Sequence, residues 1–114
     1  MAYELRRIRG QKPEYPEHSA ESFSAAPSVD AAEWERLRSR LGELLCEFAV
    51  LAKSSFAELD RPIETAHDGD KKVAGTLEAV LWQMVAHNSY HLGQIAMIRR
   101  VMGAWPPRGG GDSW

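Results

Sequence analysis

The sequence predicts an all-α protein, a bundle of long helices in one domain over residues 1–114. The first observation is that two long segments, about 31–59 and 77–102, show helical apolar periodicity. The second is that no segment shows a strand pattern or an internal repeat. The third is the composition, 44% hydrophobic and 26% charged over 114 residues, which is typical of a single globular domain.

Charge and hydropathy exclude several classes of protein. The net charge of −2 lacks the basic excess of a nucleic-acid binder. No apolar run approaches the roughly 20 residues that span a bilayer, and the N-terminus has no apolar signal core. We therefore expect no nucleic-acid partner, no membrane insertion and a cytoplasmic location. Cys46 is the one cysteine, so no internal disulfide forms, and we expect a semi-buried, inert thiol.

The first half of the chain predicts a short and a long helix. A short helix is expected over 2–9, ending at Gly10, and prolines make 11–30 an irregular loop. Asp30 is the expected N-cap of the long helix, with Glu33 placed as in a capping box. The apolar residues of this helix recur at three- and four-residue steps and are predicted to face a core; they are Trp34, Leu37, Leu41, Leu44, Leu45, Phe48, Ala52 and Leu59.

The second long helix, 77–102, follows a connection whose turn is the Asp-Gly-Asp of residues 68–70. Thr76 is its predicted N-cap, and Gly103 is placed to end it. One side of this helix carries an apolar stripe toward the core. A second side is also apolar or small, so we expect burial on two sides; its residues are Trp82, Val85, Ala86, Ser89, Leu92, Gly93 and Ala96.

His87 and His91 fall within the apolar stripe of this helix, one turn apart. An unpaired imidazole buried there would cost about 1–3 kcal/mol, and a divalent metal would satisfy both rings. The spacing leaves other interpretations open. Either ring could form a hydrogen bond with a buried carboxylate or carbonyl, or lie at a helix–helix boundary with its edge exposed to water. His18 and His67 fit solvated loop positions better than ligand positions.

The C-terminal part of the chain resembles a known family. The run His87-Asn-Ser-Tyr-His91-Leu-Gly-Gln-Ile95, with the segment 99–114 after it, is similar to the end of DinB/YfiT-like proteins. The resemblance is specific over about 75–114. It implies an up-down four-helix bundle with a divalent metal, nickel or zinc, held by three histidines. His87 and His91 match the last two, and a small-molecule thiol or other substrate is the implied partner.

Members of this family are usually longer at the N-terminus. The resemblance places residues 2–9 at the end of the second helix, so that the chain lacks the first helix and part of the second. The first metal histidine would then precede Met1, and His18, His67, a partner chain or water would supply the third ligand. Two long amphipathic helices cannot cover each other's apolar faces, so we expect a homodimer, with two-fold symmetry, to complete the bundle.

Three functions remain open at this point. The first is a DinB-like metal-dependent enzyme of the hydrolase or thiol-dependent transferase type, with His87 and His91 as metal ligands and no catalytic residue assigned. The alternative is a catalytically inactive, metal-poor dimerising bundle that acts as an interaction or structural module. The third is a small-molecule binding protein with an apolar pocket between helices.

Overall fold

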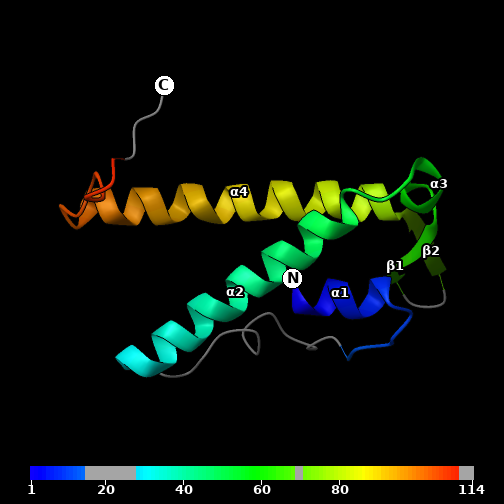
Figure 1. Ribbon diagram of the computed structural model, residues 1–114, viewed down its shortest axis with the longest axis horizontal. Coiled ribbons are helices and arrows are strands. Elements are labelled where there is room, and N and C mark those ends of the chain that lie inside the picture. Colours follow the sequence, from blue (N-terminus) through cyan, green and yellow to red (C-terminus); the bar gives the residue numbers. More distant parts are fainter. Residues whose placement is uncertain (15–27, 69–70, 111–114) are drawn as a thin grey trace. The chain divides into compact units, whose positions relative to one another are not determined.

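The computed structural model describes residues 1–14, 28–68 and 71–110, without the side chains of 65–68 and 71–74. Most of these residues are helical, as predicted. The elements follow one another as α1 (Ala2–Ile8), α2 (Ala31–Leu51), α3 (Phe56–Leu59), β1 (Pro62–Asp68), β2 (Lys71–Thr76) and α4 (Leu77–Val101) (Figure 1). The chain divides into two compact units, Met1–Leu81 and Trp82–Trp114. Across the described ranges, no helix combines the length and the apolar character that a bilayer crossing requires.

The end of the first helix and the start of the second lie at residues that the sequence marks. α1 ends just before Gly10, which has a φ of +75°, a conformation that favours glycine. The Asp30 carboxylate caps α2 by accepting from the N–H of Glu33 at 2.7 Å. The Glu33 carboxylate pairs with Arg36, so this ion pair replaces the second bond of a capping box.

The prediction of one continuous helix over 31–59 is wrong. α2 ends at Leu51, and a separate single-turn helix, α3, begins at Phe56. The Ser55 hydroxyl accepts from the N–H of Glu58 at 3.3 Å. A serine that caps a new helix in this way competes with continuation of the old one.

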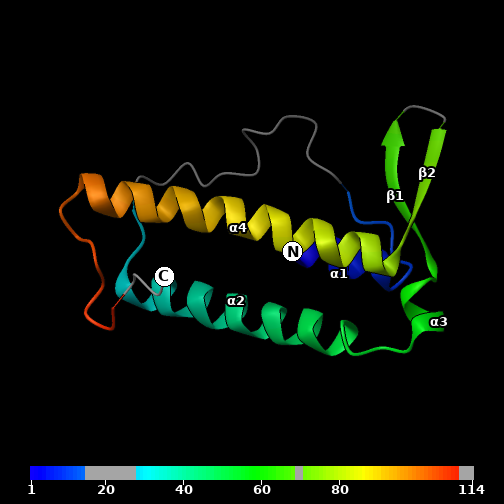
Figure 2. The same cartoon turned by 90° about the horizontal axis from the view of Figure 1, so that it is seen from above.

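A β-hairpin follows α3, which corrects the expectation of a chain without strands (Figure 2). Its strands pair antiparallel, with Pro62 opposite Thr76 and a bulge between Glu64 and Ala66. Proline is tolerated at Pro62 because it is the first residue of a strand. The predicted Asp-Gly-Asp turn falls between the strands, and its residues 69–70 lie outside the described part of the chain.

The first unit has a small apolar core to which both helices and strands contribute. Arg7 links α1 to β1, because its Nε donates to the carbonyl oxygen of Glu64 at 2.9 Å. The N–H of Leu77 donates to the carbonyl oxygen of Arg61 at 2.9 Å, so the base of the hairpin is joined directly to the first turn of α4. The buried side chains of this unit, among the described residues, are Leu5, Ile8, Leu44, Phe48, Ile63, Leu77 and Val80.

α4 begins and ends close to the predicted positions. The Thr76 hydroxyl accepts from the N–H of Ala79 at 3.1 Å and caps the helix. At the other end Gly103 has a φ of +67°, and the N–H of Ala104 donates to the carbonyl oxygen of Arg99 at 2.8 Å. The Arg99 guanidinium donates back to the Ala104 carbonyl oxygen, which secures the helix C-terminus.

The predicted apolar stripes are largely exposed in the single chain. On α2, Leu44 and Phe48 are buried, whereas the other large stripe residues are 43–58% exposed; they are Trp34, Leu37, Leu41 and Leu45. The part of α4 in the second unit also carries apolar side chains that are 52–66% exposed, and we consider Trp82, Val85, Leu92, Ile95 and Ile98. Within the second unit, these side chains of α4 are therefore not buried. We call these nine residues the exposed apolar set.

Candidate metal centre on α4

The two histidines of α4 converge on each other. The Nε2 atoms of His87 and His91 lie 3.0 Å apart, and the ring centroids are 4.5 Å apart with an angle of 80° between the ring planes. The α-helix places residues four apart on one face, which is why the sequence could predict this approach. The Nε2 atoms of the two rings are therefore within hydrogen-bond distance of each other.

Gln94 orients His91 from the next turn of the helix. The Oε1 atom of Gln94 lies 3.0 Å from Nδ1 of His91, and a carbonyl oxygen can only accept. Nδ1 of His91 therefore carries the proton in the neutral ring, and Nε2 keeps its lone pair for His87 or for a metal. The Gln94 amide nitrogen donates to the Tyr90 hydroxyl at 3.0 Å, which holds the amide in this orientation.

The separation of the two Nε2 atoms fits two ligands of one ion. Zinc–nitrogen bonds are about 2.0–2.1 Å long, so two nitrogens on a tetrahedral zinc lie about 3.3 Å apart. The observed 3.0 Å differs from that value by a few tenths of an ångström. The same distance also suits a direct hydrogen bond, in which Nε2–H of His87 donates to Nε2 of His91.

The third ligand of a three-histidine site is not among the described residues. Among the side chains that the structure describes, no three from histidine, cysteine, aspartate and glutamate come together as a metal-binding group. His18 lies outside the described residues. His67 belongs to β1, and its side chain is not described. The predicted pair is brought together, while the two loop histidines are not placed relative to it.

The burial expected for the histidines is not found in the single chain. His87 and His91 are both exposed, as are Ile95 and Ile98 further along the same stripe. The stripe argument assumes that the apolar face is covered, and the residues of the second unit do not cover the two rings. Within that unit, the free-energy cost of burying two unpaired imidazoles does not arise.

Gln94 is the site residue that sequence reasoning missed. Its signal was the helix spacing, because it lies three residues after His91 and four after Tyr90, and such pairs are neighbours on a helix. Amides that accept from the outer nitrogen of a histidine often fix its tautomer in metal sites.

Comparison with known proteins gives no further information about this site. No family model, no curated protein and no solved structure matches the chain. The functional argument therefore depends on the residues of α4 and their contacts.

Proposed function

We propose that the chain is a DinB-like metal-binding protein in which His87 and His91 are two ligands of one divalent ion, nickel or zinc. The observation that supports this most directly is the 3.0 Å approach of the two Nε2 atoms. The contact from Gln94 to Nδ1 of His91 is of the kind that prepares an imidazole for a metal. The resemblance of residues 75–114 to the DinB/YfiT-like family supports the same assignment.

The proposed reaction is of the hydrolase or thiol-dependent transferase type. A bound divalent ion would supply Lewis acidity, which activates a water molecule or a small thiol cosubstrate. The protein's own part is to hold two neutral imidazoles in place through the rigid α4 helix and the Gln94 contact. A third ligand, from His18, His67 or a second copy of the chain, would complete the usual set of three.

We further propose that two copies of the chain form a homodimer that completes the helical bundle. The exposed apolar set supports this, because large apolar patches on a monomer usually mark an interaction surface. Both α2 and the second half of α4 contribute to the set. A symmetric pair would cover the same residues on each copy.

Metal titration by calorimetry on untagged protein tests the assignment. We expect wild-type protein to bind nickel or zinc stoichiometrically, and His87→Ala and His91→Ala each to lose most of that binding. His18→Ala and His67→Ala test the two candidate third ligands, because a fall in affinity in either would identify that ligand. The assignment is wrong if the wild type binds neither metal, or if His87→Ala binds as tightly as the wild type.

The alternative function is a metal-poor, catalytically inactive dimerising bundle that serves as an interaction or structural module. It is favoured by the two-residue donor set within the described residues and by the hydrogen-bond distance between the two rings. Elemental analysis of protein purified without a histidine tag separates the two functions. A stoichiometric transition metal supports the first, and protein without metal that still dimerises supports the second.

A further inference from the structure

We propose that the pocket formed by α1, the segment after it and the start of β1 binds a small organic anion, with Lys12 and Arg61 holding the charged group. The pocket has a volume of about 390 Å³, within the range of small-molecule sites. Its lining comes from residues 3–13 and 61–64, all in the first unit. The proposal is independent of the histidine pair and of the proposed metal function.

Apolar groups line part of this pocket. Ile8 and Ile63 both contribute, and they are only 5% and 3% exposed, so they belong to the core as well. Pro13 and Pro62 add ring carbons from the two segments that meet there. Ile8 and Ile63 are already out of water, so an apolar ligand body would remove mainly the surface of the two proline rings from water, which favours binding.

Three cationic side chains also line the pocket, against one carboxylate. The cations are Arg7, Lys12 and Arg61, and the acid is Glu64. Arg7 is committed to the fold, because it donates to the Glu64 carbonyl oxygen and forms an ion pair with Glu4 at 2.7 Å. The choice of an anionic ligand therefore depends on the other two cations.

Arg61 is held in place but retains donors. Its Nε donates to the Glu58 carboxylate at 2.7 Å, and one terminal nitrogen donates to the carbonyl oxygen of Ile8 at 3.4 Å. A guanidinium carries five N–H groups, so three remain for a ligand. Positioning by existing bonds reduces the entropy that a ligand contact would otherwise lose.

Lys12 supplies the uncompensated charge. Its side chain is exposed, and in the described part of the chain its ammonium group has neither an ion-pair partner nor a hydrogen-bond acceptor. The charges of Arg7 and Arg61 are each balanced by a glutamate of their own, Glu4 and Glu58. A carboxylate placed between Lys12 and the remaining Arg61 donors would gain charge-assisted hydrogen bonds.

The simplest molecule that matches both the apolar and the cationic residues of the lining is a small apolar ring that carries one carboxylate. We choose para-fluorobenzoate as the probe, observed by fluorine NMR with the full chain. We expect its resonance to shift and broaden on binding, while the neutral para-fluorobenzamide changes much less. Backbone amide shifts should change for residues 8–13 and 61–64 rather than along the exposed apolar set.

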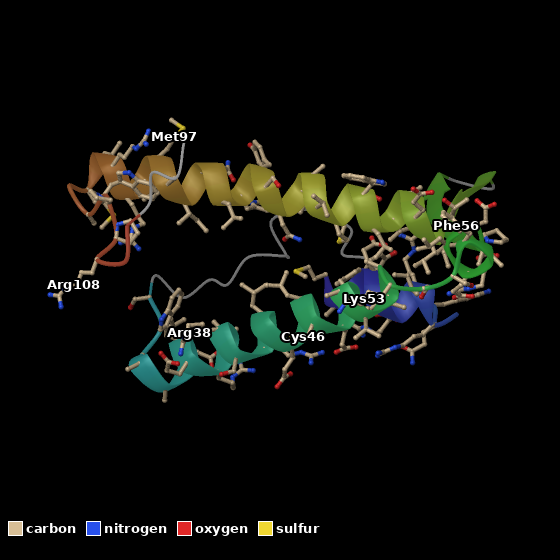
Figure 3. The ribbon with its side chains drawn as sticks, turned by 45° about the horizontal axis from the view of Figure 1, so that its top comes forward. Arg38, Cys46, Lys53, Phe56, Met97 and Arg108 are labelled. Carbon is tan, nitrogen blue, oxygen red and sulfur yellow. The ribbon has the colours of Figure 1, made fainter. Side chains whose placement is uncertain are left out.

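A lysine variant with a matched control tests the role of charge. Lys12→Gln should raise the dissociation constant for para-fluorobenzoate about fivefold, the effect of losing one charge-assisted contact. Lys53→Gln removes the same charge from an exposed lysine that does not line the pocket (Figure 3), and should leave binding unchanged. Lys12 has no partner to lose, so its substitution should leave the fold intact, which circular dichroism checks.

Several outcomes would overturn this proposal. They are an unaltered probe resonance with wild-type protein, equal binding of the benzoate and the benzamide, and equal constants for the two lysine variants. Acetate competes for the cations but has no ring. If acetate displaces the benzoate at equal concentration, the apolar lining contributes nothing to binding, and an anion with an apolar body is excluded as the ligand.

Discussion

Gln94 is the side chain that contacts Nδ1 of His91. We expect Gln94→Leu to remove the acceptor of Nδ1–H, so that the ring no longer favours that tautomer. Nickel or zinc affinity should fall by about 10- to 100-fold, as is usual for such partners. Imidazole nitrogen NMR shifts report the tautomer without metal, and calorimetry reports the affinity. Gln94→Glu keeps an acceptor and is the control; unchanged nitrogen shifts in Gln94→Leu would show that the contact does not set the tautomer.

A second residue-scale prediction concerns the first turn of α2. A side-chain hydrogen bond from Arg36 holds the pKa of the Glu33 carboxyl below its ordinary value, and the same bond raises the pKa of Arg36. A carboxyl with a lowered folded pKa stabilises the protein above its unfolded pKa, and that stabilisation is lost as pH falls through the folded value. Both side chains are exposed, so the effect on stability is small.

Arg36→Gln should return the pKa of Glu33 toward the ordinary value of a glutamate. The carboxyl carbon of Glu33, followed by NMR through an acid titration, gives the shift directly. Arg38→Gln breaks the neighbouring pair with Glu35 and is the matched control. A Glu33 titration curve that is the same in all three proteins would contradict the assignment of the bond.

At the scale of single elements, the sequence correctly predicted the helix ends that are set by contacts within one turn. The cap at Asp30, the cap at Thr76 and the stop at Gly103 are all confirmed. The break in the long helix was missed because the apolar spacing continues across it to Leu59. The serine cap that begins a new helix at Ser55 is a local competitor that periodicity does not detect.

The hairpin was missed for a different reason. Its first strand, Pro62–Asp68, begins with proline, and its apolar and polar residues do not alternate cleanly. A two-stranded hairpin is marginal by itself, and here Ile63 joins the core of the first unit. That support comes from tertiary packing, which no local pattern reports. The Asp-Gly-Asp of residues 68–70 predicted a turn between the two segments, but the strands on either side of it were not predicted.

The start of α4 should contribute strongly to stability, because it is buried. Val80 is 1% exposed and Val101, on the last turn of the same helix, is 88% exposed. We expect Val80→Ala to lower the free energy of unfolding by about 2 kcal/mol through lost burial and a cavity. Val101→Ala should change it by less than about 0.5 kcal/mol. Urea denaturation of both variants measures the difference, and equal losses would show that Val80 is not a core residue.

At the scale of the whole molecule, the prediction of a mostly helical chain is confirmed, although one hairpin interrupts it. Of the periodic residues of α2, the core of the first unit takes Leu44 and Phe48. Periodicity identifies which face is apolar, but it does not say what covers that face. The histidine pair follows the same rule: its convergence is a local property of one helix that the spacing predicts, whereas its burial is not.

The proposed homodimer gives a prediction at this scale. Wild-type protein should sediment as a dimer, and Leu41→Glu should shift it to a monomer, because a charge on the apolar face cannot be buried without a partner. Ser39→Glu places the same charge on α2 outside the predicted stripe and should remain dimeric. Helical circular dichroism of both variants confirms that they fold. A wild type that sediments as a monomer would refute the homodimer.

Cys46 on α2 is exposed (Figure 3), which corrects the semi-buried thiol expected from the sequence. This exposure has a practical consequence for the sedimentation experiment. Because the chain carries one sulfhydryl, a nitroxide label would attach at a single position, and spin–spin coupling would arise only between two associated copies. The same accessibility allows oxidation to crosslink neighbouring molecules, so sedimentation should be run under a reductant. An association that survives reduction would then be non-covalent.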